Sequence, residues 1–347
     1  MSRAPGIDVQ DRLVFLIGAP RSGSTLLARM LGAHPAVYAP VEPHLMPPLA
    51  HLGYHETVER APYDPIITQR GLREFVAGLP RGEQDYLDAV RAMTDTLYGR
   101  ALAASGRELF LDKTPAYALV LDFLAKLYPK ARYLVLTRHP MAVWSSYVDS
   151  FFDGDFEAAH RQNPLLERYV PAIARFLRER TVALERVRYE ELVREPEATL
   201  GRLCTFLGVA FDPLMVDYGE AEGAPKAAAR GLGDPVTVAR ETRPTTRSVQ
   251  KWAATVASSA GRRAQAEAIL ARLPDEDLET WGTPRAAIEA DLRALPAGGG
   301  RALRSPLTRY ALERRALVLA RRHVQRDTLG LRRLVRAVRA ACDVLLR

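Results

Sequence analysis

The sequence predicts an α/β protein with a parallel sheet flanked by helices. Short apolar runs of strand length alternate with segments of helical periodicity, which is typical of strands joined by right-handed helical crossovers. A second observation is the glycine pair in Gly18-x-x-x-x-Gly23, which lies between the first apolar run and the first helical segment. A third is that Gly18, Lys113 and Arg138 each lie at or just after a predicted strand end, where such sheets bind ligands.

The first half of the pattern contains two of the predicted strands. Leu13–Ile17 is a short apolar run, and residues 24–33 follow with apolar side chains at helical spacing. Residues 83–104 have a long helical pattern, residues 108–111 are the second strand candidate, and residues 117–128 are predicted to be helical. The glycine loop therefore has the strand–loop–helix context that a phosphate-binding loop requires.

The second half supplies two more strands. The apolar segment 132–137 (RYLVLT) is predicted to be a buried strand. Pro140 then opens a helix, because proline is tolerated in the first helical turn. Residues 186–189 are the fourth strand candidate, and a helix is predicted over 190–207. That helix is expected to end at Gly208, since glycine commonly follows the last helical residue.

The chain is predicted to consist of one main domain, residues 1–295, and a C-terminal extension, residues 296–347. Residues 218–247 are rich in Gly, Pro, Ala and Thr with little periodicity, so we expect a lid or a flexible loop there. Residues 296–300 (PAGGG) are typical of a linker. The extension beyond them has the pattern of a basic amphipathic helix, which would pack on the domain or lie on an anionic membrane surface.

Most of the net charge of +8 belongs to this extension. Residues 301–347 contain 13 arginines and 3 acidic residues, so the rest of the 347-residue chain is close to neutral. The basic character therefore belongs to the extension and says little about the main domain, and we expect no nucleic-acid partner.

The cysteine content indicates the compartment. Cys204 and Cys342 are the two cysteines, and they have neither the spacing of metal ligands nor the number of a disulfide framework. We find no apolar stretch of signal-peptide length at the N-terminus and no segment of membrane-span length. We therefore expect a cytoplasmic protein, which would be peripheral to a membrane if its extension lies on the lipid surface.

The glycine loop lacks one residue of an ordinary nucleotide triphosphate site. Ser24 occupies the position of the lysine that reaches the β- and γ-phosphates in such sites, and the basic residue of the loop is Arg21. Backbone N–H groups and a helix N-terminus still form an anion site, to which hydroxyls contribute donors. Asp112 is the nearest candidate for holding magnesium. The loop thus favours a single phosphate whose attached group faces Arg21.

A second phosphate element follows the strand at 132–137. Arg138 comes directly after the strand, and Ser146 lies eight residues further on, about two turns into the next helix. An arginine and a hydroxyl from one strand–helix junction can hold a phosphate group. The alternative is a surface ion pair of Arg138.

Together these motifs resemble the paired nucleotide signatures of sulfotransferases that use 3′-phosphoadenosine 5′-phosphosulfate (PAPS), in particular the tyrosylprotein and carbohydrate branch. GAPRSGSTLL at 18–27 resembles their 5′-phosphosulfate loop, and LTRHPMAVWSSY at 136–147 their 3′-phosphate element. Further matches are AHP at 33–35, DKTP at 112–115, YPKA at 128–131 and VRYEELVREPEATLGRLCTFLGV at 187–209. The resemblance covers residues 12–255 and implies a P-loop-like fold and sulfuryl transfer from PAPS to an acceptor hydroxyl.

The resemblance implies a role for each residue of these elements. The 5′-phosphosulfate would be bound by the loop residues, with Arg21 near the bridging oxygen, where negative charge builds as the S–O bond breaks. Arg138 and Ser146 would bind the 3′-phosphate. Tyr189 would position the nucleotide, unless it is a core residue, and Lys251 would reach phosphate from the C-terminal side. The loop residues in question are Arg21, Ser22, Gly23, Ser24 and Thr25.

The general base is less clearly indicated. Lys113 in DKTP matches a lysine that the family places near the transferred group, but the histidine that many relatives have two positions later is Pro115 here. Glu42, in VEPHL, lies where the tyrosylprotein branch has its catalytic glutamate, and we take it as the base. His44 is its rival, while His34 is expected to be structural.

Two other classes of function stay open at this point. One is a phosphotransferase or nucleotide hydrolase with a degenerate loop, which would need magnesium. The other is a non-catalytic anionic-surface binder acting through the basic extension. The sulfotransferase scheme requires no metal ion, and its acceptor is a sugar, lipid, peptide or secondary metabolite with a hydroxyl, which the sequence does not distinguish.

Overall fold

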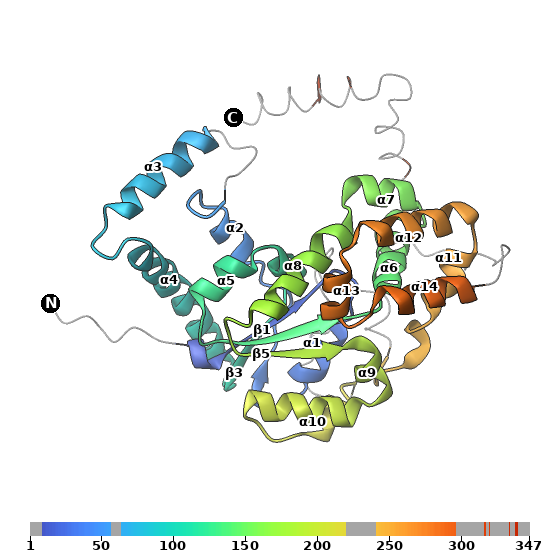
Figure 1. Cartoon of the computed structure of the whole chain (residues 1–347). Coiled ribbons are helices and arrows are strands. Elements are labelled where there is room, and N and C mark those ends of the chain that lie inside the picture. Colours follow the sequence, from blue (N-terminus) through green and yellow to red (C-terminus); the bar gives the residue numbers. More distant parts are fainter. Residues whose placement is uncertain are drawn as a thin grey trace.

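The fold is built on a parallel sheet flanked by helices, as the sequence predicts, and the sheet has five strands, one more than the four predicted (Figure 1). The computed structural model describes residues 9–56, 64–219 and 241–295, together with positions 316, 319, 333, 337 and 338. The strand order is β2-β3-β1-β4-β5, and every neighbouring pair is parallel. The strands are β1 (Leu13–Gly18), β2 (Val37–Tyr38), β3 (Leu109–Asp112), β4 (Arg132–Thr137) and β5 (Leu184–Arg188).

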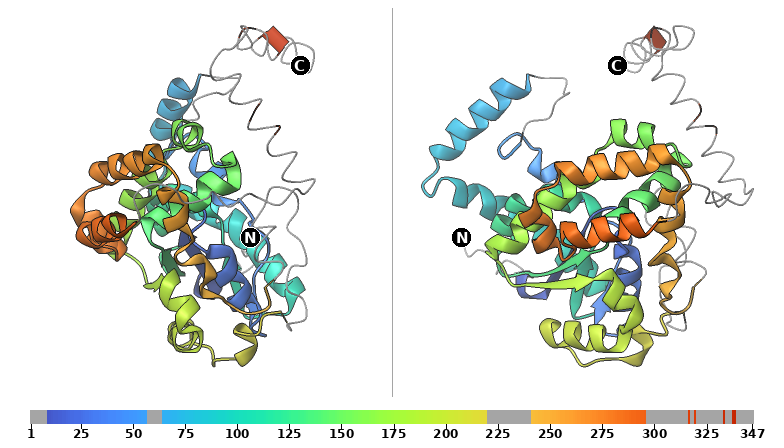
Figure 2. Two further views of the ribbon diagram at one scale, coloured as in Figure 1. Left: turned by 90° about the vertical axis from the view of Figure 1, so that its right-hand side faces the viewer. Right: turned by 45° about the vertical axis from the view of Figure 1, so that its right-hand side comes forward.

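Helices cover both faces of this sheet. In the views of Figures 1 and 2, α1, α9 and α10 lie on one face, and α5, α8 and α13 lie on the other. The α-helices are α1 (Ser24–Gly32), α2 (Met46–Ala50), α3 (Pro65–Ala77), α4 (Glu83–Ser105), α5 (Leu121–Leu127), α6 (Pro140–Phe152), α7 (Phe156–Gln162), α8 (Leu165–Glu179), α9 (Tyr189–Arg194), α10 (Pro196–Leu207), α11 (Lys251–Ala257), α12 (Ala260–Arg272), α13 (Asp275–Trp281) and α14 (Arg285–Ala294). Four 3-10 turns, η1 (Gln10–Arg12), η2 (Pro115–Leu119), η3 (Pro213–Met215) and η4 (Thr246–Ser248), complete the described elements.

The sheet separates the apolar core into two layers, and its central strand β1 contributes side chains to both. All six of its residues are buried, and because successive side chains of a strand point to opposite faces, alternate residues enter different cores. Phe15 and Ile17 pack in the layer under α5 and α8, whereas Val14 and Leu16 pack in the layer under α1 and α10. The apolar run that predicts this strand is therefore continuous because both of its faces are covered.

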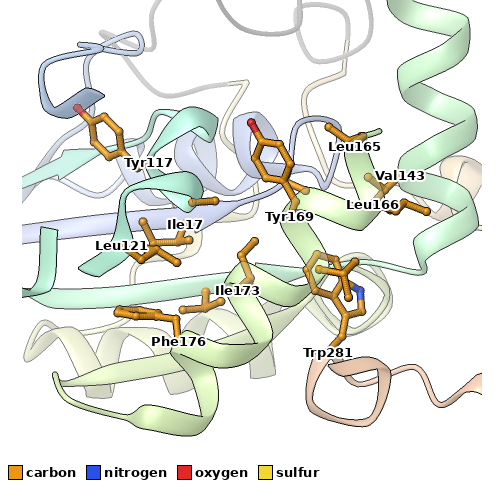
Figure 3. Packing of buried hydrophobic residues seen from close by; sticks show 14 of the residues in the cluster. Ile17, Tyr117, Leu121, Val143, Leu165, Leu166, Tyr169, Ile173, Phe176 and Trp281 are labelled. Atoms are coloured by element: carbon orange, nitrogen blue, oxygen red, sulfur yellow. The ribbon is translucent and has the colours of Figure 1, made fainter. Parts of the chain in front are cut away.

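Phe15 lies at the centre of an aromatic cluster. Its ring centroid is 6.5 Å from Tyr98, 6.2 Å from Tyr117, 5.6 Å from Tyr128 and 5.4 Å from Tyr133. On the same side of the sheet, α8 packs Tyr169, Ile173 and Phe176 in the same core, and Trp281 of α13 belongs to this core as well (Figure 3). This core fixes β1 and β4, whose carboxyl ends carry the glycine loop and Arg138.

Two predicted helices differ from the observed ones. The predicted helix 190–207 is interrupted at Glu195 (φ −132°, ψ 60°), giving α9 and α10. The residue before a proline is disfavoured in helical geometry, and Pro196 has no N–H to donate. Likewise the predicted helix 117–128 is divided at Val120, where φ is −130°.

The strands also differ in detail from the prediction. The two-residue edge strand β2 has no sequence signal, because two residues cannot show a period. The fourth predicted strand begins two residues earlier, at Leu184, and Tyr189 belongs to α9. The expected end of α10 is confirmed, with Gly208 in the left-handed region (φ 72°).

The predicted lid at 218–247 lies largely outside the described residues, and so do the linker and nearly all of the basic extension. The proposed division into residues 1–295 and 296–347 therefore stays a prediction. Within the described part of the chain, no helix has both the length and the apolar character needed to cross a bilayer.

We predict that Phe15→Ala lowers the free energy of unfolding by about 3–5 kcal/mol, because truncating a fully buried phenylalanine leaves a cavity among packed rings. Urea denaturation of the purified chain measures this. The control is Phe75→Ala on α3, where the side chain is 68% exposed and the expected change is within about 0.5 kcal/mol. Equal losses in the two variants would contradict the central position of Phe15.

Candidate active site

The glycine loop turns sharply between β1 and α1. Arg21 and Gly23 both have left-handed backbone conformations, with φ of 69° and 102°, and the N–H of Ser22 donates to Ala19 O at 3.1 Å. Gly18 leaves room for Ser22, since a Cβ there would lie 2.7 Å from Ser22 Oγ. No side chain caps α1 at its N-terminus. The first N–H groups of the helix therefore remain available to an anion, together with the favourable end of its dipole.

Arg138 fastens this loop to the end of β4. Its Nη1 donates to Arg21 O at 3.0 Å, and its Nη2 donates to Ser248 O at 2.6 Å. The guanidinium lies 4.2 Å from the ring centroid of Tyr189, and the same ring packs against Gly23. Burial lowers the pKa of Arg138, but the ordinary pKa of arginine is so high that the group stays charged.

The two phosphate elements of the sequence meet through Arg21. Its Nε donates to Ser146 Oγ at 3.2 Å, across 125 positions of sequence. Ser146 therefore contacts the arginine of the first element, although we expect it to act with Arg138 of the second. A ligand with two phosphate groups would meet both elements within one site.

A buried ion pair lies beside the end of the loop. Lys113 is only 4% exposed, and its ammonium group donates to Glu42 and, at 3.4 Å, to Thr25 Oγ1. Glu42 also interacts with His44 Nε2, at 3.2 Å from its Oε2. Burial lowers the pKa of Lys113, and the Glu42 carboxylate opposes this shift. The structure thus brings together Glu42, Lys113 and His44, three of the four predicted catalytic residues; the fourth is Arg21 of the loop.

Two other predicted residues lie in different surroundings. Lys251 begins α11, and its side chain is exposed, so its contact with phosphate stays a prediction. Tyr189 is 6% exposed and supports Arg138 through its ring face, so its contact with a nucleotide stays a prediction. His34 is structural as expected, because its Nδ1 accepts from the Ala36 N–H and its Nε2 lies 2.8 Å from Ala210 O.

Asp112 is held in the core by two tyrosines. It is completely buried and accepts hydrogen bonds from Tyr98 at 2.6 Å and Tyr117 at 2.9 Å. Burial raises the pKa of Asp112 to about 6, while the two phenols and Lys113 oppose the shift. In the described residues, no group of three or more His, Cys, Asp and Glu side chains could hold a metal ion.

Sequence reasoning missed several residues that build the site. Ser248 supplies a carbonyl to Arg138, Glu190 accepts the N–H of His139 at 2.9 Å, and Trp281 Nε1 donates to Arg138 O at 2.8 Å. The nearest sequence signal is the expected contact of Lys251 with phosphate, three residues after Ser248. Backbone carbonyls carry no sequence signature, so these contacts become visible only in the fold.

The site has unsatisfied polar groups suited to an anionic ligand. Ser22 Oγ and Arg138 Nε are buried, and neither has a hydrogen-bond partner among the residues that the structure describes. Buried polar groups are normally paired, and unpaired ones are costly. Phosphate oxygens accept several hydrogen bonds and would satisfy both donors. The donor set therefore fits a ligand with phosphate groups.

Comparison with known proteins gives a family model and several relatives. The model described as "Sulfotransferase family" matches residues 14–213. The chain is 31% identical over 261 residues to the nodulation protein NoeE of Sinorhizobium fredii (strain NBRC 101917 / NGR234), covering 69% of this chain and 59% of that protein. It is 25% identical over 218 residues to a putative protein-tyrosine sulfotransferase of Caenorhabditis briggsae, covering 62% of this chain and 71% of the other.

A solved structure with similarity is the sulfotransferase domain from the olefin synthase of Synechococcus PCC 7002. It has a TM-score of 0.49 and 24% identity, covering 78% of this chain and 92% of that domain. The chain spans only about three fifths of the length of NoeE.

The buried carboxyl of Asp112 predicts a pH dependence of stability. Its folded-state pKa of about 6 lies above the ordinary value of 3.8 for an aspartate, so the native state holds this proton more tightly than the unfolded chain does. The protonated carboxyl of Asp112 therefore contributes about 2–3 kcal/mol to the free energy of unfolding. This contribution is fully present below about pH 4 and is lost as the pH rises through 6. Asp112→Asn removes it. We expect the stability of this variant relative to wild type to increase from pH 4 to pH 7, measured by urea unfolding; a constant difference would contradict the assignment.

Proposed function

The chain belongs to the sulfotransferase family, and from that premise we propose that it transfers a sulfuryl group from PAPS to an acceptor hydroxyl. The observation that supports this proposal best is the meeting of the two phosphate elements beside a buried lysine and carboxylate. Arg21 contacts Ser146, Arg138 contacts the loop backbone, and Lys113 contacts Glu42 and Thr25.

The donor would be held by its two ends. The loop 21–25 and the N-terminus of α1 would bind the 5′-phosphosulfate, and Arg138 would bind the 3′-phosphate with Nε, the guanidinium nitrogen that lacks a partner among the described residues. Lys251 would reach a phosphate from α11 if its exposed side chain turned toward the site. This ligand has no γ-phosphate, which accounts for the serine at position 24 in place of a lysine.

The transfer would be an in-line displacement at sulfur. The acceptor oxygen forms the new S–O bond while the bond to the 5′-phosphate oxygen breaks, leaving adenosine 3′,5′-bisphosphate. Arg21 and Lys113 would stabilise the negative charge on the leaving oxygen and the sulfuryl oxygens, because fixed cations act most strongly where charge develops. Positioning of the two reactants contributes the rest.

Glu42 would accept the proton of the acceptor hydroxyl. A base must lie within hydrogen-bond reach of that proton, and Glu42 adjoins Lys113, which would face the transferred group. In the structure Lys113 occupies one carboxylate oxygen of Glu42 and His44 adjoins the other. Turning of Lys113 toward bound sulfuryl oxygens would therefore free the carboxylate for catalysis, with His44 as the neighbouring alternative base.

The acceptor is proposed only as a hydroxyl compound. One relative is described as a nodulation protein and another as a putative protein-tyrosine sulfotransferase, so the family membership does not select among a sugar, lipid, peptide or secondary metabolite. The cytoplasmic location and the membrane contact of the basic extension remain proposals from the sequence.

We predict metal-independent binding of adenosine 3′,5′-bisphosphate. Calorimetric titration in EDTA should show tight binding to wild type, and Arg138→Ala should weaken it by about 10–100-fold, the loss of a charge-assisted contact. Arg132→Ala is a matched control, because Arg132 lies at the opposite end of the same strand and contacts Asp11 O. Binding of ATP with magnesium instead would favour the phosphotransferase alternative, and binding of neither nucleotide would favour the surface binder.

We further predict that Glu42→Gln lowers kcat by about 10²–10⁴-fold, because glutamine keeps the shape of the side chain but cannot accept the proton. Affinity for adenosine 3′,5′-bisphosphate should stay unchanged. The measurement is formation of this product from PAPS with a panel of phenol, sugar, alcohol and tyrosine-peptide acceptors. His44→Gln is the comparison: a larger loss there than in Glu42→Gln would assign the base to His44.

A further inference from the structure

A buried hydrogen-bond network connects Asp112 to the segment that carries Glu42. The hydroxyl of Tyr117 donates to Asp112 Oδ2 at 2.9 Å. The hydroxyl oxygen of Tyr117 in turn accepts hydrogen bonds from the backbone N–H groups of Leu45 at 3.1 Å and Met46 at 3.4 Å. A phenol hydroxyl has one hydrogen to donate and two lone pairs. The carboxylate of Asp112 therefore fixes the direction of this hydroxyl and leaves both lone pairs for the backbone.

A second side chain holds the preceding N–H group. Thr114 Oγ1 accepts from the N–H of His44 at 3.2 Å. Three successive N–H groups, at positions 44, 45 and 46, are thus bound by side chains that follow β3. These groups lie at the N-terminus of α2, whose N-cap residue Leu45 provides no side-chain cap. Tyr117 therefore supplies the capping interaction that the sequence of α2 lacks.

The held segment has a strained backbone. His44 has φ of 53°, and a residue with a Cβ in the left-handed region is disfavoured unless its surroundings enforce that conformation. This turn directs Glu42 toward Lys113 and places His44 beside it. The network supplies such enforcement on the C-terminal side of the turn.

We propose that Tyr117, oriented by Asp112 and assisted by Thr114, is a positioning residue that fixes the turn at residues 42–46 and so holds Glu42 beside Lys113 for proton transfer. The inference rests on the proposed function of Glu42 as the general base. Tyr117 is completely buried and touches no reacting atom, so it acts through the backbone alone. Burial and the neighbouring carboxyl raise the pKa of Tyr117, which keeps its hydroxyl protonated.

The chain contains a matched control for this role. Tyr98 on α4 also donates to Asp112 Oδ2, at 2.6 Å, is also buried, and its ring also packs near Phe15. The hydroxyl of Tyr98 is hydrogen-bonded to Asp112, whereas the hydroxyl of Tyr117 is bonded both to Asp112 and to the backbone of the turn. Replacing either tyrosine by phenylalanine removes one buried hydroxyl that donates to the carboxyl group of Asp112. Only Tyr117→Phe also releases the N–H groups of residues 45 and 46.

The experiment compares Tyr117→Phe and Tyr98→Phe in turnover, nucleotide affinity and hydrogen exchange. We expect Tyr117→Phe to lower kcat for sulfuryl transfer from PAPS by about 10–100-fold, because small displacements of a reacting group are that costly. The Kd for adenosine 3′,5′-bisphosphate should be unchanged, and the amides of residues 44–46 should exchange faster. Tyr98→Phe should keep kcat within about threefold of wild type, since the turn keeps its contacts.

Several outcomes would overturn the proposal. Equal losses of kcat in the two variants would indicate a general effect of the core, and an unchanged kcat in Tyr117→Phe despite faster exchange would show that the position of the turn does not matter. If Tyr117→Phe fails to fold, Thr114→Val and Thr114→Ser replace it: the serine variant should retain turnover and the valine variant should lose it.

The test also separates this inference from the proposed function. A wild-type chain that transfers no sulfuryl group to any acceptor of the panel, or to water, would refute the function of Glu42 and with it the catalytic part of the inference. Hydrogen exchange would then still decide whether Tyr117 holds the turn. If the amides of residues 44–46 exchange faster in Tyr117→Phe but not in Tyr98→Phe, Tyr117 holds the turn. Identical exchange in the two variants overturns this part of the inference.

Discussion

The buried guanidinium of Arg138 is the group on which the rest of the site depends. It joins three segments that are far apart in the sequence, because it donates to the carbonyl of Arg21 in the loop and of Ser248 before α11, and stacks on Tyr189 of α9. A buried charge must find compensating dipoles, so the three segments converge on it. Their convergence sets the position of the loop relative to β4 and hence the spacing between the two phosphate elements.

Much of this architecture could be predicted from the sequence because buried parallel strands are covered on both faces and therefore have continuous apolar sequences. β1, β3 and β4 were found in this way, and the loop and Arg138 were placed correctly at strand ends. The contact between Arg21 and Ser146 could not be predicted, since helical spacing places Ser146 near Arg138 but does not say toward which arginine its hydroxyl turns. The sequence likewise did not predict the strand β2 or the helix break before Pro196. The local geometry of such segments depends on the tertiary contacts that they make.

The candidate base illustrates how tertiary contacts add to a motif. Residue matching places Glu42, Lys113 and His44 in one site, but it does not reveal that the lysine and the carboxylate neutralise each other while largely removed from water. An ion pair in such surroundings gains little net stability, because loss of hydration offsets the attraction. Either partner can therefore exchange its neighbour for a ligand of suitable charge at modest cost. The pair is thus suited to a site whose charge changes during a reaction.

The order of the strands gives the two halves of the site different freedom to change. The nucleotide elements follow β1 and β4, which have neighbours on both sides and supply both cores. Glu42, by contrast, follows β2, a two-residue strand at the edge of the sheet that pairs with β3 alone. Substitutions at exposed positions between residues 39 and 56, outside the turn at residues 42–46 and the buried residues Leu49 and Ala50, therefore disturb few contacts. Changes in the central strands disturb both cores. A chain of this design could acquire a new acceptor by altering its edge while its donor chemistry stays the same, so diversification of acceptors is an outcome that the topology itself favours.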